Sequence, residues 1–348
     1  MTTFDKIPVV DISALGGGDR ARHDDVIRQL RHASEHVGFL YVSGHGVPEP
    51  ALAGLLGAAK RFFALPMDEK MQVYIGLSRN HRGYVPEGEE VFAGGTPDAK
   101  EAFDLSIDLP PDDPDYLGGN PLLGPNQWPA ALPGFRDSVT AYYNAAHALG
   151  KRLLRGFSEA LGLPEDQLDR FVTKPPSQLR LIHYPYRAEA VDRPGIGAHT
   201  DYEIFTLLLP TAPGLEVMNG DGAWIDAPPV PGALVVNIGD MLEVWSNGTF
   251  TATSHRVRRV SQERYSFPLF FSCDYWTKVE PLPQFVSAER PAAYPAVVAG
   301  EHLYAQTAQT FQYLKRRLAS GELSLSENSL SLSSFGPEAR RKLEKSEQ

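Results

Sequence analysis

Three residues of the chain have the types and the spacing of a metal-binding set. His199 and Asp201 are separated by one residue, and His255 follows 54 residues after Asp201. Residues i and i+2 of a strand point to the same face, so His199 and Asp201 can converge on one ion. A later β segment can bring His255 beside them. Two imidazoles and a carboxylate can occupy one face of an Fe(II) ion and leave the opposite face open for a co-substrate and O2.

The H-x-D pattern is weak by itself, because the chain has ten histidines. It gains weight from Arg264-Tyr265-Ser266, which begins nine residues after His255 on a β pattern. We expect the remaining histidines to be structural or surface residues, namely His23, His32, His36, His45, His81, His147, His183 and His302.

Arg264 and Ser266 share one face of their predicted strand and together suit a carboxylate. A guanidinium binds a carboxylate through two parallel hydrogen bonds, and a hydroxyl can add a third. The alternative, an exposed strand arginine in an ion pair, stays open from these residues alone.

Composition excludes several classes of protein. The chain has 348 residues, a formal net charge of −10 and one cysteine, Cys273. The acidic balance argues against a nucleic-acid partner, which calls for a basic patch. No secretory signal and no apolar run of about 18 residues is visible, so we expect no membrane partner and a cytoplasmic protein. We expect Cys273 to be a small buried residue in a strand, and the chain to be a monomer or a weak homo-oligomer.

Hydrophobic periodicity predicts mostly helices before about residue 176 and mostly strands after it. Helices are predicted at 24–37, 50–64, from 66 onward, 135–161 and 301–318. Strands are predicted at 7–12, 39–42, 178–186, 205–209, 215–218, 233–237, 251–257 and 264–275. Residues 110–133, rich in Pro, Gly and Asp, are predicted to be a surface loop. Many short strands separated by turn signals favour a sandwich or a barrel.

These motifs, taken with Gly38-Phe39-Leu40-Tyr41-Val42 and Asn237-Ile238-Gly239-Asp240, resemble a known family. The chain is similar, over about residues 7–318, to the isopenicillin N synthase-like family of Fe(II)/2-oxoglutarate-dependent dioxygenases. The resemblance implies a mostly β fold with flanking helices, in which a double-stranded β-helix (jelly-roll) core follows a helical N-terminal region. The parts it implies are an N-terminal helical/β dioxygenase region at 1–115, a loop and long support helix at 116–175, an Fe(II)/2-oxoglutarate jelly-roll core at 176–285, and a C-terminal helix with a Ser-rich tail at 286–348.

The resemblance also implies roles for single residues. His199, Asp201 and His255 would be the metal ligands of a non-heme Fe(II) centre. Arg264 and Ser266 would bind the distal carboxylate of 2-oxoglutarate, and Tyr184 would hydrogen-bond the same region. Two positions before that tyrosine, where many plant relatives have Asn, this chain has Ile182.

The activity implied is an oxidoreductase that uses Fe(II), 2-oxoglutarate and O2. It hydroxylates or desaturates a small-molecule substrate and releases succinate and CO2. The alternatives are an isopenicillin N synthase-like Fe(II) oxidase that uses O2 without 2-oxoglutarate, an ethylene-forming type of activity, and a non-catalytic binding protein on the same fold.

Substrate contacts are predicted at four further positions. Arg180 shares a strand face with Tyr184, so it could meet a substrate carboxylate, although a structural ion pair fits equally well. Tyr202 directly follows Asp201. Glu90 and Phe92 belong to a segment, 82–92, that resembles one near the substrate pocket of relatives; for Glu90 the alternative is a solvated surface charge.

Overall fold

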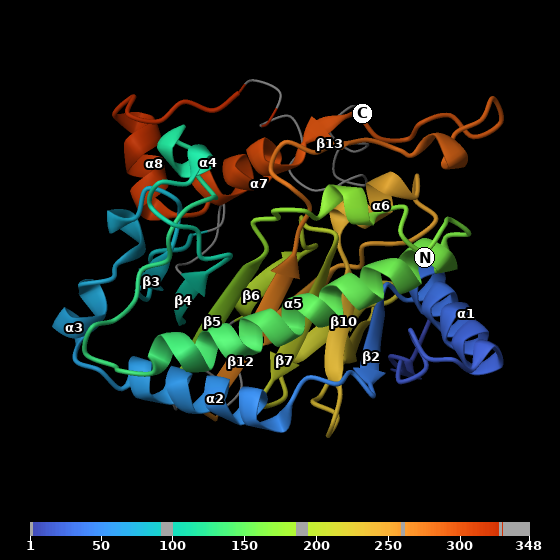
Figure 1. The fold of residues 1–348 in the computed structure, drawn as a ribbon, viewed down its shortest axis with the longest axis horizontal. Coiled ribbons are helices and arrows are strands. Elements are labelled where there is room, and N and C mark those ends of the chain that lie inside the picture. Colours follow the sequence, from blue (N-terminus) through green and yellow to red (C-terminus); the bar gives the residue numbers. More distant parts are fainter. Residues whose placement is uncertain (1–2, 92–99, 186–193, 259–261, 327–328, 330–348) are drawn as a thin grey trace.

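A large mixed sheet lies at the centre of the fold (Figure 1). The computed structural model describes residues 3–91, 100–185, 194–258, 262–326 and 329. The strand order of this sheet is β1-β2-β10-β7-β12-β5-β4-β3. Its strands are β1 (Val9–Asp11), β2 (Phe39–Ser43), β3 (Gly83–Val85), β4 (Glu101–Leu105), β5 (Gln178–Tyr184), β7 (Phe205–Pro210), β10 (Leu234–Ile238) and β12 (Arg264–Phe271).

A smaller sheet faces the large one. It has the order β6-β11-β8-β9 and consists of β6 (Pro194–His199), β8 (Leu215–Met218), β9 (Trp224–Asp226) and β11 (His255–Arg258). A cavity between the two sheets is lined by Leu208 and Ser266 from the large sheet and by Leu215 and Val257 from the small one. This two-sheet enclosure is the jelly-roll core that the sequence predicted.

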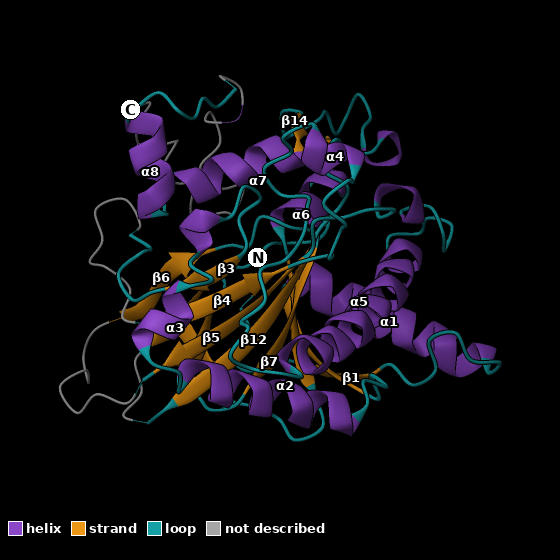
Figure 2. Ribbon diagram, turned by 60° about the vertical axis from the view of Figure 1, so that its left-hand side comes forward, coloured by secondary structure: helices purple, strands orange, loops and turns teal. Residues whose placement is uncertain are grey.

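Three helices cover the outer face of the large sheet, and Figure 2 shows them on one side of the strands. They are α1 (Arg20–His36), α2 (Glu49–Phe63) and α5 (Phe135–Ala160). Helix α5 packs on both others and on β12, because its apolar residues recur at helical spacing. It approaches the sheet closely at Gly150, which lies against the ring of Phe271.

Shorter elements close one end of the sheets, where α7 (Ala299–Ala308) and α8 (Gln312–Ala319) lie above the strands (Figure 2). Helix α6 (Asp240–Trp245) follows β10. The other short elements are α3 (Met67–Met71), α4 (Pro114–Leu117), β13 (Lys278–Val279), β14 (Val297–Val298) and the 3-10 turns Ile75–Leu77, Asp169–Phe171 and Pro283–Phe285.

The predicted single helix at 301–318 is wrong in one respect, because the structure divides it in two. Between α7 and α8 the chain extends to pair with the 89–91 segment: the N–H of Val91 donates to the carbonyl of Thr310 at 2.9 Å, and Glu90 bridges Phe311. The periodicity continues through this break, so the sequence pattern alone does not reveal it.

Other predicted boundaries also differ from those in the structure. The strand predicted at 251–257 begins only at His255, and that predicted at 264–275 ends at Phe271. Cys273 is fully buried as expected, but it lies just after the strand. The predicted loop at 110–133 contains α4, and its Leu122 and Leu123 are buried rather than at the surface. The short strands β3, β4, β6 and β9 and helix α6 had not been predicted.

No helix within the described ranges is long and apolar enough to cross a membrane. Most of the Ser-rich tail lies outside the described residues.

The contact between α5 and β12 generates a stability prediction. Gly→Ala in a helix interior ordinarily stabilises by up to about 1 kcal/mol. A Cβ at Gly150 would clash with Cδ2 and Cε2 of the Phe271 ring, so Gly150→Ala should instead lower the free energy of unfolding by about 1–3 kcal/mol. The matched control is Gly54→Ala in α2, where a Cβ would meet nothing closer than 3.9 Å, and this variant should be neutral or stabilised. Denaturant unfolding measures both; equal effects at the two sites would contradict the close packing.

Candidate metal centre and adjoining cavities

The ends of two paired strands bring the predicted metal-binding residues together. His199 is the last residue of β6 and His255 is the first of β11, and the antiparallel register sets them opposite each other. Asp201 lies two residues beyond the end of β6. The three side chains form a group whose ligand atoms all lie within 4.8 Å of one another. Among the described residues, this is the one His/Cys/Asp/Glu group of three or more that could hold a metal ion.

The ring nitrogens of both histidines turn toward one oxygen of Asp201. Nε2 of His199 lies 3.7 Å from Asp201 Oδ1, and Nε2 of His255 lies 3.6 Å from it. Each Nδ1 faces a backbone carbonyl, at 2.8 Å from Gly197 for His199 and at 3.3 Å from Thr253 for His255. A carbonyl accepts, so each Nδ1 carries the proton and each Nε2 presents its lone pair to the space beside Oδ1.

The surroundings of His255 and Asp201 favour the protonation states that bind metals. Burial, together with the neighbouring His199, lowers the pKa of His255 to about 4, so its imidazole is neutral at physiological pH. Burial alone would raise the pKa of Asp201, but His255, His199 and two hydrogen bonds outweigh it and lower the pKa. The carboxylate is therefore ionised.

The second oxygen of Asp201 is fully occupied. Oδ2 accepts from the Thr206 hydroxyl at 2.5 Å and from the Asn237 amide at 2.7 Å. These two donors lie side by side, because Asn237 of β10 pairs with Thr206 of β7 in the sheet register. The large sheet thus orients the carboxylate so that only Oδ1 faces the two imidazoles.

The cavity between the sheets ends at a buried cation. Arg264 is 1% exposed; its Nε donates to the Ala212 carbonyl at 3.3 Å and its Nη2 to the Ser266 hydroxyl at 3.4 Å. Within the described part of the chain, Nη1 of Arg264 and the hydroxyl of Tyr184 have no hydrogen-bond partner. The guanidinium lies 4.9 Å from the Tyr184 ring centre, and the β5–β12 register sets the two residues opposite each other.

These orphaned donors fit a carboxylate ligand. Burying polar groups without partners is costly, and a carboxylate at this end of the cavity would satisfy both the guanidinium and the phenol. The same cavity is lined at its other end by His199, Asp201 and His255. The residues present therefore fit a metal ion that also binds an elongated dicarboxylate.

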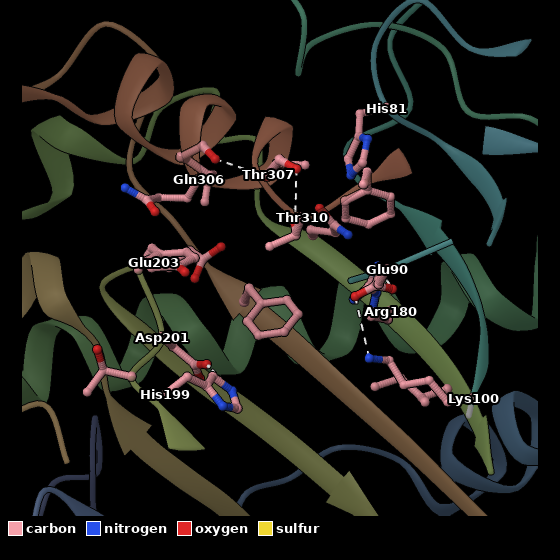
Figure 3. A pocket seen from close by; sticks show the side chains of 17 residues that line it. His81, Glu90, Lys100, Arg180, His199, Asp201, Glu203, Gln306, Thr307 and Thr310 are labelled. Carbon is pink, nitrogen blue, oxygen red and sulfur yellow. Dashed lines mark hydrogen bonds and ion pairs between the residues drawn. The ribbon is translucent and has the colours of Figure 1, made fainter. Parts of the chain in front are cut away.

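A second cavity, lined in part by His199 and Asp201, adjoins the group (Figure 3). It shares Ile182, His199, Asp201 and Phe270 with the first cavity. Its roof comes from α7 and from the extended break before α8.

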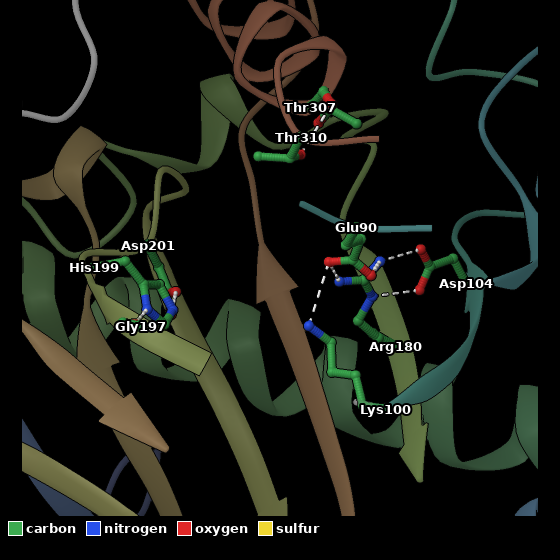
Figure 4. Close-up of polar contacts among 9 residues, drawn as sticks. All are labelled: Glu90, Lys100, Asp104, Arg180, Gly197, His199, Asp201, Thr307 and Thr310. Carbon is green, nitrogen blue, oxygen red and sulfur yellow. Dashed lines mark hydrogen bonds and ion pairs between the residues drawn. The ribbon is translucent and has the colours of Figure 1, made fainter. Parts of the chain in front are cut away.

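Three of the predicted substrate residues line this second cavity. Arg180 lines it, but its guanidinium is held by two carboxylates: Asp104 at 2.7 and 2.8 Å and Glu90 at 2.9 and 3.0 Å (Figure 4). This is the geometry of the ion-pair alternative. Glu90 is buried rather than solvated. Burial would raise its pKa, but Arg180 and the nearby Lys100 lower it. Tyr202 lines the cavity and packs edge-on against His302; Phe92 lies outside the described residues.

Sequence reasoning missed several residues that line the second cavity. Lys100 and Glu203 are buried there, and Gln306, Thr307 and Thr310 reach it from the roof. Burial raises the pKa of Glu203 to about 8, and the Asp201 carboxylate adds to the shift. A signal for Glu203 existed: it is an acid two residues after Asp201, directly before the apolar run Ile204-Phe205. The residues of the roof could be identified only from the packing of α7 in the structure.

Two family models match the chain. Residues 7–131 match the N-terminal model of non-haem dioxygenases in morphine synthesis, and residues 175–273 match the model of the 2OG-Fe(II) oxygenase superfamily.

Individual relatives are similar over most of their length. The 2-oxoglutarate-Fe(II) type oxidoreductase hxnY of Emericella nidulans is 34% identical, over 90% of this chain and 93% of the relative. The homoarginine-6-hydroxylase 2-ODD-C23 of Glycine max is 36% identical, over 89% of this chain and 98% of the relative. Among solved structures, a 2OG-Fe(II) oxygenase family protein from Caulobacter crescentus is 32% identical with a TM-score of 0.76, covering 91% of this chain and 99% of that one.

The hydrogen bonds to Asp201 generate a prediction about metal affinity. Thr206→Val keeps the side-chain shape but removes the donor to Oδ2, and loss of such an orienting partner typically costs about 10–100-fold in metal affinity. We expect Fe(II) or Mn(II) to bind more weakly by that factor in an anaerobic calorimetric titration. Thr206→Ser, which retains a hydroxyl, is the control and should lose much less. Equal affinities of the two variants would show that the hydroxyl does not orient the carboxylate.

Proposed function

The chain belongs to the 2OG-Fe(II) oxygenase superfamily, and on that premise we propose that His199, Asp201 and His255 hold its iron. The protein is a non-heme Fe(II)- and 2-oxoglutarate-dependent dioxygenase that acts on a small molecule. The observation that carries the ligand assignment is the convergence of two Nε2 atoms on Asp201 Oδ1 while the other carboxylate oxygen is occupied. Two imidazoles and one carboxylate oxygen on one face are the donor set of a facial triad.

We propose that Arg264, Ser266 and Tyr184 anchor the distal carboxylate of 2-oxoglutarate. The support is the unpartnered Nη1 of Arg264 and the unpartnered Tyr184 hydroxyl, both at the end of the cavity that leads to the triad. A bidentate guanidinium contact fixes both the position and the direction of a carboxylate. These three residues, which we call the carboxylate clamp, thus set which end of the co-substrate faces the metal.

When bound, Fe(II) and 2-oxoglutarate supply the oxidising chemistry, in which O2 is consumed, succinate and CO2 are released and the substrate is hydroxylated or desaturated. The chain contributes positioning and exclusion of water. Apolar side chains separate the clamp from the second cavity, among them Ile182 and Phe270, which line both. Among the described lining residues, the two cavities share only His199, Asp201 and these two side chains, so co-substrate and substrate approach the metal from different sides.

We propose that the second cavity binds the substrate, with Tyr202 in its wall and Glu90 held in place by Arg180 and Lys100. The soybean relative is named for an amino acid, which supports a small polar substrate of similar size. Phe92 stays a proposed substrate contact, and so do the cytoplasmic location, the monomeric or weakly oligomeric state and the four-part division of the chain.

The ligand assignment predicts a spectroscopic result. Anaerobic protein loaded with Fe(II) should develop a visible charge-transfer band when 2-oxoglutarate is added, because the co-substrate chelates the metal. His199→Ala removes one of three ligands and should abolish the band at concentrations that saturate the native protein. His32→Ala, at an exposed position of α1, is the control and should keep it. A band that persists in His199→Ala would refute the ligand set, and no band in the native protein would favour an oxidase that does not use 2-oxoglutarate.

The clamp assignment predicts a loss of co-substrate affinity. Hydrogen bonds to charged groups are worth about 1.5–3 kcal/mol, so Arg264→Gln should weaken 2-oxoglutarate binding by about tenfold to a few hundredfold. Titrating the charge-transfer band gives the dissociation constant directly. Arg258→Gln, on β11 and half-exposed beside Asp226, is the matched control and should leave it unchanged. Unaltered affinity in Arg264→Gln would place the co-substrate carboxylate elsewhere.

A further inference from the structure

The charged residues on the far wall of the second cavity pair with one another. Arg180 joins Asp104 and Glu90, and Lys100 donates to Glu90 at 3.4 Å (Figure 4). Two cations therefore meet two carboxylates, so these four side chains together carry no net formal charge. Each of the three guanidinium nitrogens of Arg180 donates a hydrogen bond to a carboxylate oxygen. The side chain therefore has little capacity left to bind a ligand.

Glu203 lies on the opposite side of the same cavity, on the side of the triad (Figure 3). It is 6% exposed. No lysine, arginine or histidine among the described residues forms an ion pair with it, and its carboxylate lines the cavity wall. Acidic side chains are rarely this deeply buried unless a cation lies beside them. Glu203 is therefore a buried acid for which the described chain supplies no cationic partner.

The loaded metal centre does not supply the partner either. Fe(II) and the Arg264 guanidinium together carry three positive charges. The Asp201 carboxylate and the two carboxylates of 2-oxoglutarate carry three negative charges, which balance them. The centre is then formally neutral, as the Arg180 network is. Glu203 remains the one carboxylate of the described cavity wall that faces the substrate space without a counter-charge.

We propose that Glu203 is the counter-charge for a cationic group of the substrate, an ammonium or a guanidinium. The inference rests on the proposed function, because it takes the second cavity as the substrate site. A charge-assisted hydrogen bond from an N–H cation to a buried carboxylate is strong and directional. Glu203 and Asp201 lie on the same side of the cavity, so a cation held by Glu203 lies on the side of the metal ligands (Figure 3). The oxidised carbon then lies near the cationic group rather than at the far end of the substrate.

The test measures charge preference with isosteric ligand pairs. The probes are L-arginine with L-citrulline and L-homoarginine with L-homocitrulline; both members of each pair carry the α-ammonium group, and they differ in the charge of the side chain. Each is titrated anaerobically into protein holding Fe(II) and 2-oxoglutarate, and binding is followed by the shift of the charge-transfer band and by calorimetry. We expect at least one cation to bind the native protein about tenfold to a hundredfold more tightly than its uncharged partner.

Glu203→Gln keeps the size of the side chain and removes the charge. It should abolish the preference for the cation while leaving the affinities for Fe(II) and 2-oxoglutarate and the melting temperature near those of the native protein. Glu159→Gln on α5, where the acid pairs with His23 far from the cavity, is the matched control and should keep the preference.

Two outcomes would overturn the proposal: no cation binds better than its uncharged isostere, or the preference survives in Glu203→Gln. A melting temperature that falls strongly in Glu203→Gln with no change in preference would assign the residue a structural role. If the charge-transfer band itself fails to form in the native protein, the proposed function fails first. If the band forms but no probe is discriminated, only the assignment of Glu203 fails.

Discussion

The cost of burying charge controls how this protein is organised. An ionised group inside a folded protein needs an opposite charge or several donors around it. Asp201 meets this condition through Thr206 and Asn237 on one oxygen and the two imidazoles on the other. Arg180 meets it through two carboxylates, which explains why so polar a residue can sit in a central strand. Arg264 and Glu203 have no ion-pair partner among the described residues, and both side chains line a cavity.

The strand register makes the triad the meeting point of two cavities. The β6–β11 pairing sets His255 opposite His199, and the β10–β7 pairing sets two donors behind Asp201. The β12–β5 pairing brings two residues of the proposed carboxylate clamp together, since Arg264 lies opposite Tyr184. Each pairing uses main-chain hydrogen bonds that do not depend on the functional side chains. The outer helices, with α5 packed on β12, hold the large sheet in the shape that this arrangement requires.

Much of this could be predicted from local sequence. The period of two along a strand placed Arg264 and Ser266 on one face, and the H-x-D spacing brought His199 and Asp201 together. The amphipathic pattern of 135–161 predicted the long helix to within one residue of its end. Short strands such as β3 and β9 escaped prediction because three residues carry too little periodicity to be distinguished from a turn.

The sequence by itself predicted the candidate metal ligands, the candidate carboxylate-binding residues and the chemistry that they could support, because residue type and spacing along the chain indicate them. Only the tertiary structure decided the substrate side. It paired Arg180 with Asp104 and Glu90, broke the C-terminal helix against the 89–91 segment, and left Glu203 buried without a cation. These features join residues far apart in the chain. Whether a charge is paired or faces a cavity depends on such long-range neighbours, which local patterns do not contain.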